Sequence, residues 1–114
     1  YGIASMEVLR HHGIQKQIES KLVYGESVSQ ANQFIMSQSA EIGFTARSVV
    51  LSPDLLDKGQ WRSISDSSYT PITQGAILIN RNTETKSKAE EFYTFLYSPE
   101  AKRVLQKFGY SVDE

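Results

Sequence analysis

Apolar residues recur every three to four positions in several stretches of the chain, the spacing that places them on one face of a helix. Val28, Ala31 and Phe34 begin one such stretch. The pattern predicts helices over residues 3–12, 28–38, 89–96 and 99–108, with shorter helical turns over 15–20 and 47–51. Gly13 and Gly109 follow two of these stretches and are expected to end them, because glycine readily adopts the left-handed conformation that closes a helix.

Shorter apolar runs, bounded by turn residues, predict strands. The run from Gly75 to Ile79 is almost entirely apolar, as in a strand that is covered on both faces. Strands are predicted over residues 21–24, 42–46, 61–65 and 74–80, with a turn at 57–60 and a surface loop at 82–86. Because strands and helices alternate, we expect an α/β fold in which helices flank a mixed, mostly parallel sheet.

The segment around Ser27 contains the most informative local signal. A predicted strand ends at Gly25, and Ser27 precedes Gln30 by three residues. This is the spacing of a capping box, in which the two side chains bind the first free backbone N–H groups. A strand that leads directly into a capped helix aims N–H groups at one point, which suits a small anion. Most capping boxes only cap a helix, so the spacing alone leaves both interpretations open. Ser87 and Glu90 form a second such box.

The composition is that of a globular protein, and it excludes several kinds of site. The 114 residues suffice for one domain of ordinary size. A net charge of −1 provides no basic surface for nucleic acid, and no apolar run approaches the roughly 20 residues that span a bilayer. The absence of cysteine excludes disulfides, thiolate metal sites and a cysteine nucleophile. The chain begins at Tyr1 rather than at methionine, so we expect a processed or excised piece of a longer protein.

Side chains that could catalyse a reaction or bind a metal give weak signals. His11 and His12 are adjacent, diverge by about 100° on a helix and cannot chelate one ion together. The serines lack a nucleophile-elbow motif and a suitable His/Asp partner, so we expect neither an enzyme nor a cofactor. We expect Arg47 to be exposed at a helix start rather than to contact a ligand. The following carboxylates are expected to be solvated or to complement helix dipoles: Asp54, Asp57, Glu90, Glu91, Glu100, Asp113 and Glu114.

Several blocks of sequence together carry a resemblance to a known family. In chain order they are Tyr1-Gly2, Lys21-Leu-Val-Tyr-Gly-Glu-Ser-Val-Ser-Gln-Ala31, Ile42-Gly-Phe-Thr-Ala46, Tyr69-x-Pro71-Ile72-x-Gln74-Gly75-Ala76, and residues 89–110. This order resembles the C-terminal part of the molybdate-binding proteins of bacterial and archaeal ABC transporters, which have the type II periplasmic-binding-protein fold. The resemblance covers essentially the whole chain. Its last block is shared broadly by solute-binding proteins, whereas the earlier blocks are more specific to the molybdate group.

The resemblance implies an oxyanion site that includes Tyr1, Val28 and Ala46, to which the capping box adds Ser27. In that family, two α/β lobes close on a tetrahedral oxyanion, which backbone N–H groups and hydroxyls hold. Tyr1 matches a contact at a helix start, and Val28 matches a main-chain donor. Ala46 stands where some members have a tyrosine whose hydroxyl contacts the anion, so that contact is lost or is taken over by the backbone or by a neighbour.

The resemblance also implies how the chain is organised. Residues 1–80 correspond to the second ligand-binding lobe, incomplete at its N-terminus, and residues 81–114 correspond to C-terminal helices that return to the first lobe. The first lobe of the same protein precedes Tyr1. A chain of this kind is expected to expose apolar surface and to associate with a copy of itself.

The function implied is the capture of molybdate or tungstate for delivery to the permease of an ABC importer. The expected location is the periplasm or the outer face of the cell membrane, after export by a signal peptide that this chain does not contain. We expect no nucleic acid, no transmembrane segment and no directly coordinated metal. Two alternatives remain open, because one scaffold serves many ligands: a solute-binding protein for sulfate or an organic solute, and the effector-sensing domain of a transcription regulator.

Overall fold

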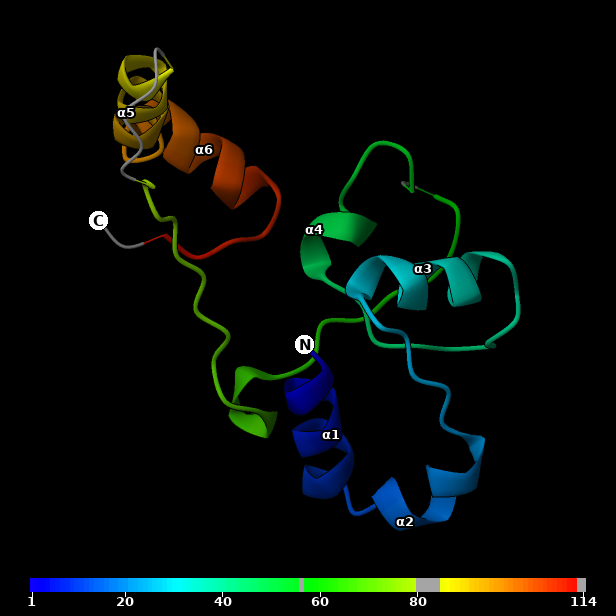
Figure 1. The fold of residues 1–114 in the computed structure, drawn as a ribbon. Coiled ribbons are helices and arrows are strands. Elements are labelled where there is room, and N and C mark those ends of the chain that lie inside the picture. The colour runs from blue at the N-terminus through cyan, green and yellow to red at the C-terminus, as the bar shows by residue number, and fades with distance from the viewer. Residues whose placement is uncertain (56, 80–84, 113–114) are drawn as a thin grey trace. The chain divides into compact units, whose positions relative to one another are not determined.

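The chain forms two compact units, Tyr1–Ile72 (unit 1) and Thr73–Glu114 (unit 2). The computed structural model describes residues 1–55, 57–79 and 85–112 (Figure 1). Unit 1 contains α1 (Gly2–His11), α2 (Gln15–Ile18), the 3₁₀ turn η1 (Glu19–Lys21), α3 (Val28–Met36), α4 (Arg47–Val50) and the 3₁₀ turn η2 (Asp66–Ser68). Unit 2 contains α5 (Lys86–Phe95) and α6 (Pro99–Lys107). The predicted lobe boundary after residue 80 falls at residues 80–84, outside the described part of the chain.

The predicted helices are confirmed, and local sequence explains where they end. Gly13, with φ of 68°, follows α1, and Gly109, with φ of 84°, follows α6. After α6, the N–H groups of Gly109 and Tyr110 donate to the carbonyls of Gln106 and Leu105. The same pattern follows α1, where the N–H groups of residues 13 and 14 donate to the carbonyls of residues 10 and 9. Both helices therefore end in a Schellman motif, which needs a left-handed residue that glycine supplies without strain.

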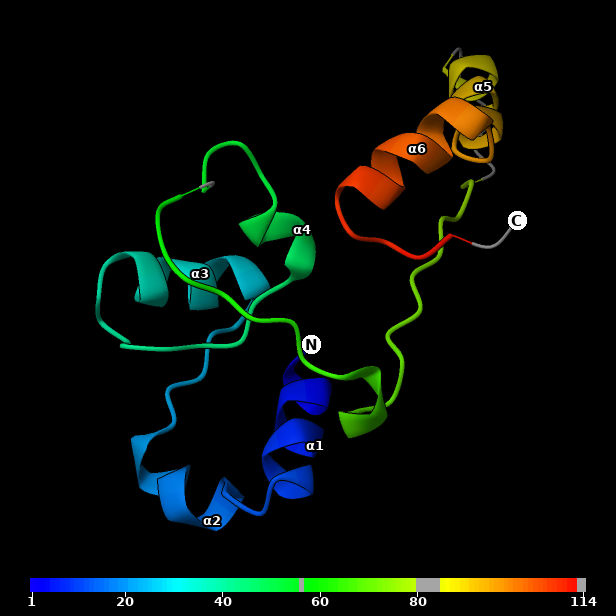
Figure 2. The same cartoon turned by 180° about the vertical axis from the view of Figure 1, so that it is seen from behind.

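The four predicted strands are not formed anywhere in the described residues, where the secondary structure is entirely helical (Figure 2). The predicted mixed sheet is therefore not seen in this part of the chain. A strand is defined by hydrogen bonds to a neighbouring strand, and side-chain pattern alone does not supply that neighbour. Apolar side chains in two of these segments remain in solvent: Ile42 is 87% exposed and Ile77 is 88% exposed.

The second predicted capping box, Ser87 with Glu90, is wrong. Helix α5 begins earlier, at Lys86, and its N-cap Thr85 makes no capping bond through its side chain. Ser87 consequently lies inside the first turn, where its hydroxyl lies 3.4 Å from Oε1 of Glu91. Glu90 instead lies 3.9 Å from Nζ of Lys86, as an exposed pair one helical turn apart. Because α5 already begins at Lys86, Ser87 lies inside the helix and cannot act as its N-cap.

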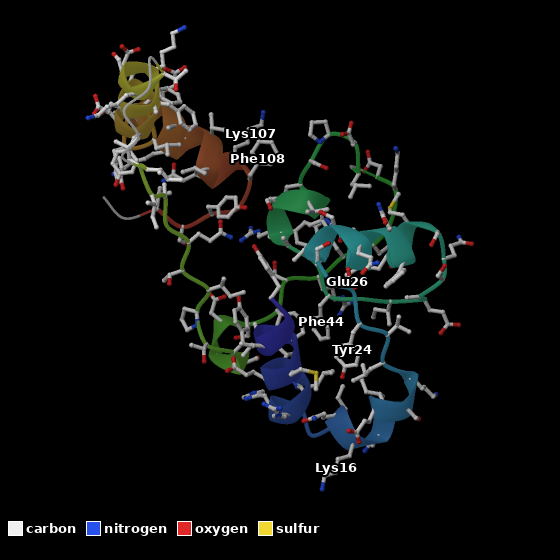
Figure 3. All side chains as sticks on the ribbon, in the orientation of Figure 1. Lys16, Tyr24, Glu26, Phe44, Lys107 and Phe108 are labelled. Carbon is white, nitrogen blue, oxygen red and sulfur yellow. The ribbon has the colours of Figure 1, made fainter. Side chains whose placement is uncertain are left out.

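Few apolar side chains are buried in the described residues: Val8, Leu9, Ala46 and Ala101. Many larger apolar side chains remain accessible to solvent. The Tyr24 hydroxyl lies 3.9 Å from the sulfur of Met6, which ties α1 to the segment before α3. Figure 3 shows Tyr24 and Phe44 in the space between α1 and α3, where they are 68% and 36% exposed. No helix among the described ranges has the length and apolar character that crossing a membrane requires.

Candidate functional site

The capping box at Ser27 is confirmed and fixes the start of α3. Ser27 has an extended backbone, with φ of −149° and ψ of 163°, and its Oγ accepts a 3.1 Å hydrogen bond from the N–H of Gln30. The side chain of Gln30 reaches back, and its Oε1 accepts a 2.7 Å hydrogen bond from the N–H of Glu26. The serine bond of the motif is therefore present, and the glutamine accepts from the residue that precedes the N-cap rather than from the N-cap itself.

Two N–H groups at the start of α3 remain available to a ligand. The N–H of Gln30 is bound by the cap, and the N–H of Ala31 donates to the carbonyl of Ser27 at 3.0 Å. The N–H groups of Val28 and Ser29 make no hydrogen bond within the described residues. An α-helix leaves its first N–H groups without intrahelical partners, and they attract negative charge. The cap of α3 thus binds the N–H groups of Glu26 and Gln30 and leaves those of Val28 and Ser29 unbound.

Gly25 allows the preceding segment to approach this helix start closely. A Cβ atom at position 25 would lie 2.9 Å from the backbone nitrogen of Ala31 and 3.0 Å from the carbonyl oxygen of Ser27. These are backbone atoms, so they cannot give way as a flexible side chain could. The glycine before the capping box is therefore required by packing against the first turn of α3.

The segment after α3 returns along the helix towards its start. A Cβ at Gly43 would lie 2.8 Å from Cδ1 of Ile35, and Thr45 Oγ1 donates a hydrogen bond to Oδ1 of Asn32. Residue 43 thus lies beside the later part of α3, and residue 45 lies beside an earlier turn. Both views of the ribbon show the segment running back beneath α3 and into α4 (Figures 1 and 2). Ala46, which follows, is consequently carried towards the end of α3 where Val28 lies.

Ala46 is the N-cap of α4 and is only 6% exposed. Its carbonyl accepts hydrogen bonds from the N–H groups of Val49 at 3.0 Å and Val50 at 3.5 Å. Arg47, the first residue of α4, is exposed, as the sequence predicted. Ser27 and Val28 thus lie at the start of α3 and Ala46 at the start of α4, and the hydrogen bond between Asn32 and Thr45 joins the two segments.

Tyr1, the fourth predicted residue, lies at the start of α1. It is the N-cap of that helix, it is 44% exposed, and its carbonyl accepts hydrogen bonds from the N–H and the hydroxyl of Ser5. Tyr69 lies near it. The phenol of Tyr69 donates a 3.0 Å hydrogen bond to Asp66, which raises the pKa of Tyr69, with smaller effects of burial and of the charges of Asp66 and Tyr1.

A shallow depression of about 420 Å³ lies elsewhere in unit 1, between α1 and η2. Its lining includes Glu7, whose carboxylate accepts hydrogen bonds from the N–H of Thr70 at 2.7 Å and its hydroxyl at 3.1 Å. These bonds anchor the end of unit 1 on α1. Arg10 and His11 also line the depression, so it presents a carboxylate and basic side chains together.

The other candidates form no site. The rings of His11 and His12 meet edge to face, with centroids 5.1 Å apart. No group of three or more potential metal ligands gathers in the described ranges of the chain. Asp113 and Glu114 lie outside those ranges. The sequence reasoning did not identify the N–H of Ser29 or the pair Asn32 and Thr45. The capping box itself could have indicated Ser29, because it leaves the N–H of the second helical residue unbound.

We expect Ser27→Ala to lower the free energy of unfolding by about 0.5–2 kcal/mol, because the N–H of Gln30 then loses its acceptor. Ser29→Ala is the matched control: Ser29 is an exposed serine in the same helical turn, and its substitution should change stability by less than about 0.5 kcal/mol. Denaturant unfolding of the two variants measures the difference. Equal stability of both variants would show that the cap contributes nothing.

Comparison with known proteins identifies the family. Residues 1–111 match the family described as bacterial extracellular solute-binding protein. The chain is 33% identical over 112 residues to the molybdate-binding protein ModA of Azotobacter vinelandii, covering 98% of this chain and 44% of that protein. It is 36% identical over 110 residues to ModA of Rhodobacter capsulatus, covering 96% of this chain and 42% of that protein. It is 24% identical over 115 residues to the putative ABC transporter substrate-binding lipoprotein YvgL of Bacillus subtilis (strain 168), covering 98% of this chain and 42% of that protein.

No solved structure matches the chain. The chain spans less than half the length of the curated relatives described above, at 42% to 44%. The family match, in contrast, extends over residues 1–111 of the chain's 114. This chain therefore belongs to the family of bacterial extracellular solute-binding proteins.

Proposed function

We propose that this chain is part of an extracytoplasmic protein that captures molybdate or tungstate and delivers it to the permease of an ABC importer. The observation that carries the proposal is the similarity, over nearly the whole chain, to two relatives named molybdate-binding proteins. The third relative, named as a transporter lipoprotein, supports a location outside the cytoplasm. The family is one of solute-binding proteins, so the proposed role is capture without chemical conversion.

The start of α3 suits a doubly charged tetrahedral anion. The N–H groups of Val28 and Ser29 point out of the first turn, and the hydroxyl of Ser27 accepts from Gln30 while keeping its own proton to donate. The backbone at Ala46 and Tyr1 would add further contacts. Such donors stabilise an anion through fixed dipoles, without a cluster of cations. This agrees with a chain whose net charge is −1.

The apolar side chains exposed in two predicted strand segments support an α/β lobe in which additional residues of the full-length protein cover them. We propose that residues 1–80 belong to the second lobe of a type II periplasmic-binding-protein fold, and that residues 81–114 return to the first lobe. The predicted strand segments would then pair in a mixed, mostly parallel sheet. Ile42 and Ile77, at 87% and 88% exposure, are side chains that such a sheet would bury between layers of helices.

Calorimetric titration of the full-length protein tests the proposed ligand. Neutral donors at fixed positions should bind molybdate and tungstate and should bind neither amino acids nor sugars. Sulfate, as a smaller dianion, and a panel of organic solutes complete the comparison. Tight binding of an organic solute together with no binding of any oxyanion would overturn the proposed ligand, although family membership would stand.

A further inference from the structure

We propose that Asn32 and Thr45 are positioning residues that set the spacing between the start of α3 and the start of α4, and thereby the size of oxyanion that the site accepts. The inference rests on the proposed function, and it deepens that function by assigning selectivity to a contact away from the ligand. Neither residue belongs to the predicted oxyanion site.

The position of Asn32 on α3 determines which turn of the helix its side chain covers. Asn32 follows Val28 by four residues and therefore lies on the same face of α3, one turn further along. Helical side chains lean towards the N-terminus of the helix, so Asn32 covers the surface over the turn before it. A group that is bonded to its side-chain oxygen consequently lies towards the first turn, where Val28 and Ser29 present their N–H groups.

The side chain of Asn32 accepts a hydrogen bond from the hydroxyl of a residue beside α4. Thr45 Oγ1 donates to Oδ1 of Asn32, and both side chains are partly buried. Thr45 directly precedes Ala46, the buried N-cap of α4. One hydrogen bond therefore joins Thr45, which lies beside the start of α4, to Asn32, which lies one turn after the start of α3.

A second contact fixes the register of the segment that contains Thr45. Ile35 lies three residues after Asn32 on α3, and its side chain covers Gly43, two residues before Thr45. The segment therefore runs back along α3, with residue 43 beside Ile35 and residue 45 beside Asn32. The contact of Ile35 with Gly43 fixes the end of the segment that lies away from the proposed site, so it does not set the spacing between the starts of α3 and α4. The Asn32–Thr45 bond fixes the end that meets the site.

Molybdate and sulfate share charge and shape but differ in size, so discrimination between them depends on the spacing of the donors. Removing the bond leaves every proposed donor in place and frees the two helix starts to move relative to each other. In metal sites, losing an outer contact of this kind costs roughly 10–100-fold in affinity. We expect about a tenfold loss for molybdate here, with a smaller loss for sulfate.

The test is a set of variants of the full-length protein: Asn32→Ala, Thr45→Val, both together, and Thr45→Ser. The two single variants and the double variant should lose a similar factor, because either change already removes the bond. Thr45→Ser retains the hydroxyl and should restore both affinity and selectivity. Ser39→Ala is the control, since it removes a 2.9 Å hydroxyl contact with Ser37 beyond the opposite end of α3.

A merely structural role would lower the melting temperature of the ligand-free protein and leave the ratio of molybdate to sulfate affinity unchanged. That result, or equal binding by wild type and both single variants, overturns the inference while the proposed function stands. A wild-type protein that binds no oxyanion overturns the proposed function, and the inference with it. A reduced affinity ratio in Thr45→Val that Thr45→Ser restores supports the inference.

Discussion

Val28→Pro should weaken molybdate binding by the full-length protein roughly 10- to 150-fold, while α3 remains folded. Proline lacks the N–H that Val28 is proposed to donate, and a hydrogen bond to a charged group contributes about 1.5–3 kcal/mol. Proline is well accepted at the first position of a helix. The residue before it must be extended, as Ser27 is, with φ of −149° and ψ of 163°.

The chain itself contains the arrangement that this variant would create. At the start of α6, Pro99 follows Ser98, whose Oγ accepts a 3.2 Å hydrogen bond from the N–H of Ala101. Val28→Ala is the matched control, because it shortens the side chain and keeps the N–H. Its affinity should stay within about twofold of wild type, a difference of less than about 0.5 kcal/mol. Equal affinities of the proline and alanine variants, both with folded α3, would remove Val28 from the site.

Residues 1–114 on their own should bind molybdate no more tightly than about millimolar. On the proposed function, the hydroxyl donors of the other lobe are needed to enclose the anion. An anion that keeps its hydration on one side gains only about 0.5–1.5 kcal/mol for each remaining hydrogen bond. A few such bonds do not offset the entropic cost of association, which is about 4 kcal/mol or more. Titration of the chain, with the full-length protein in parallel, measures the difference.

The same sample tests self-association, for which we propose the apolar faces of residues 89–96 and 101–108. Phe92 is 61% exposed and Val104 is 52% exposed, so both faces offer apolar surface to a second copy. Light scattering during the titration reports the mass. Micromolar binding by a monomer would show that the proposed site is complete within this chain.

The elements that the sequence predicted well are those that depend on neighbouring residues. The box at Ser27 closes within four residues, and the glycines at 13 and 109 act on the helices directly before them. The box at Ser87 failed for an equally local reason, because α5 begins one residue earlier, at Lys86, and Ser87 lies inside its first turn.

The features that the sequence did not predict depend on residues far apart in the chain. Strands need a partner strand, and the segment that contains Ile77 has none in the described residues. The bond from Thr45 to Asn32 spans 13 positions, and the bonds from Thr70 to Glu7 span 63. No periodicity in the sequence indicates such pairs. The hydrogen bond that joins the segment before α4 to α3 could therefore be found only from the structure.

The most direct test of the account is a crystal structure of the full-length protein with molybdate, in which anomalous scattering locates the molybdenum atom. The account predicts that the oxyanion lies at the start of α3, with one of its oxygens about 2.7–3.2 Å from the backbone nitrogen of Val28. An oxyanion bound in the depression between α1 and η2, or at any place out of reach of the first turn of α3, would contradict it.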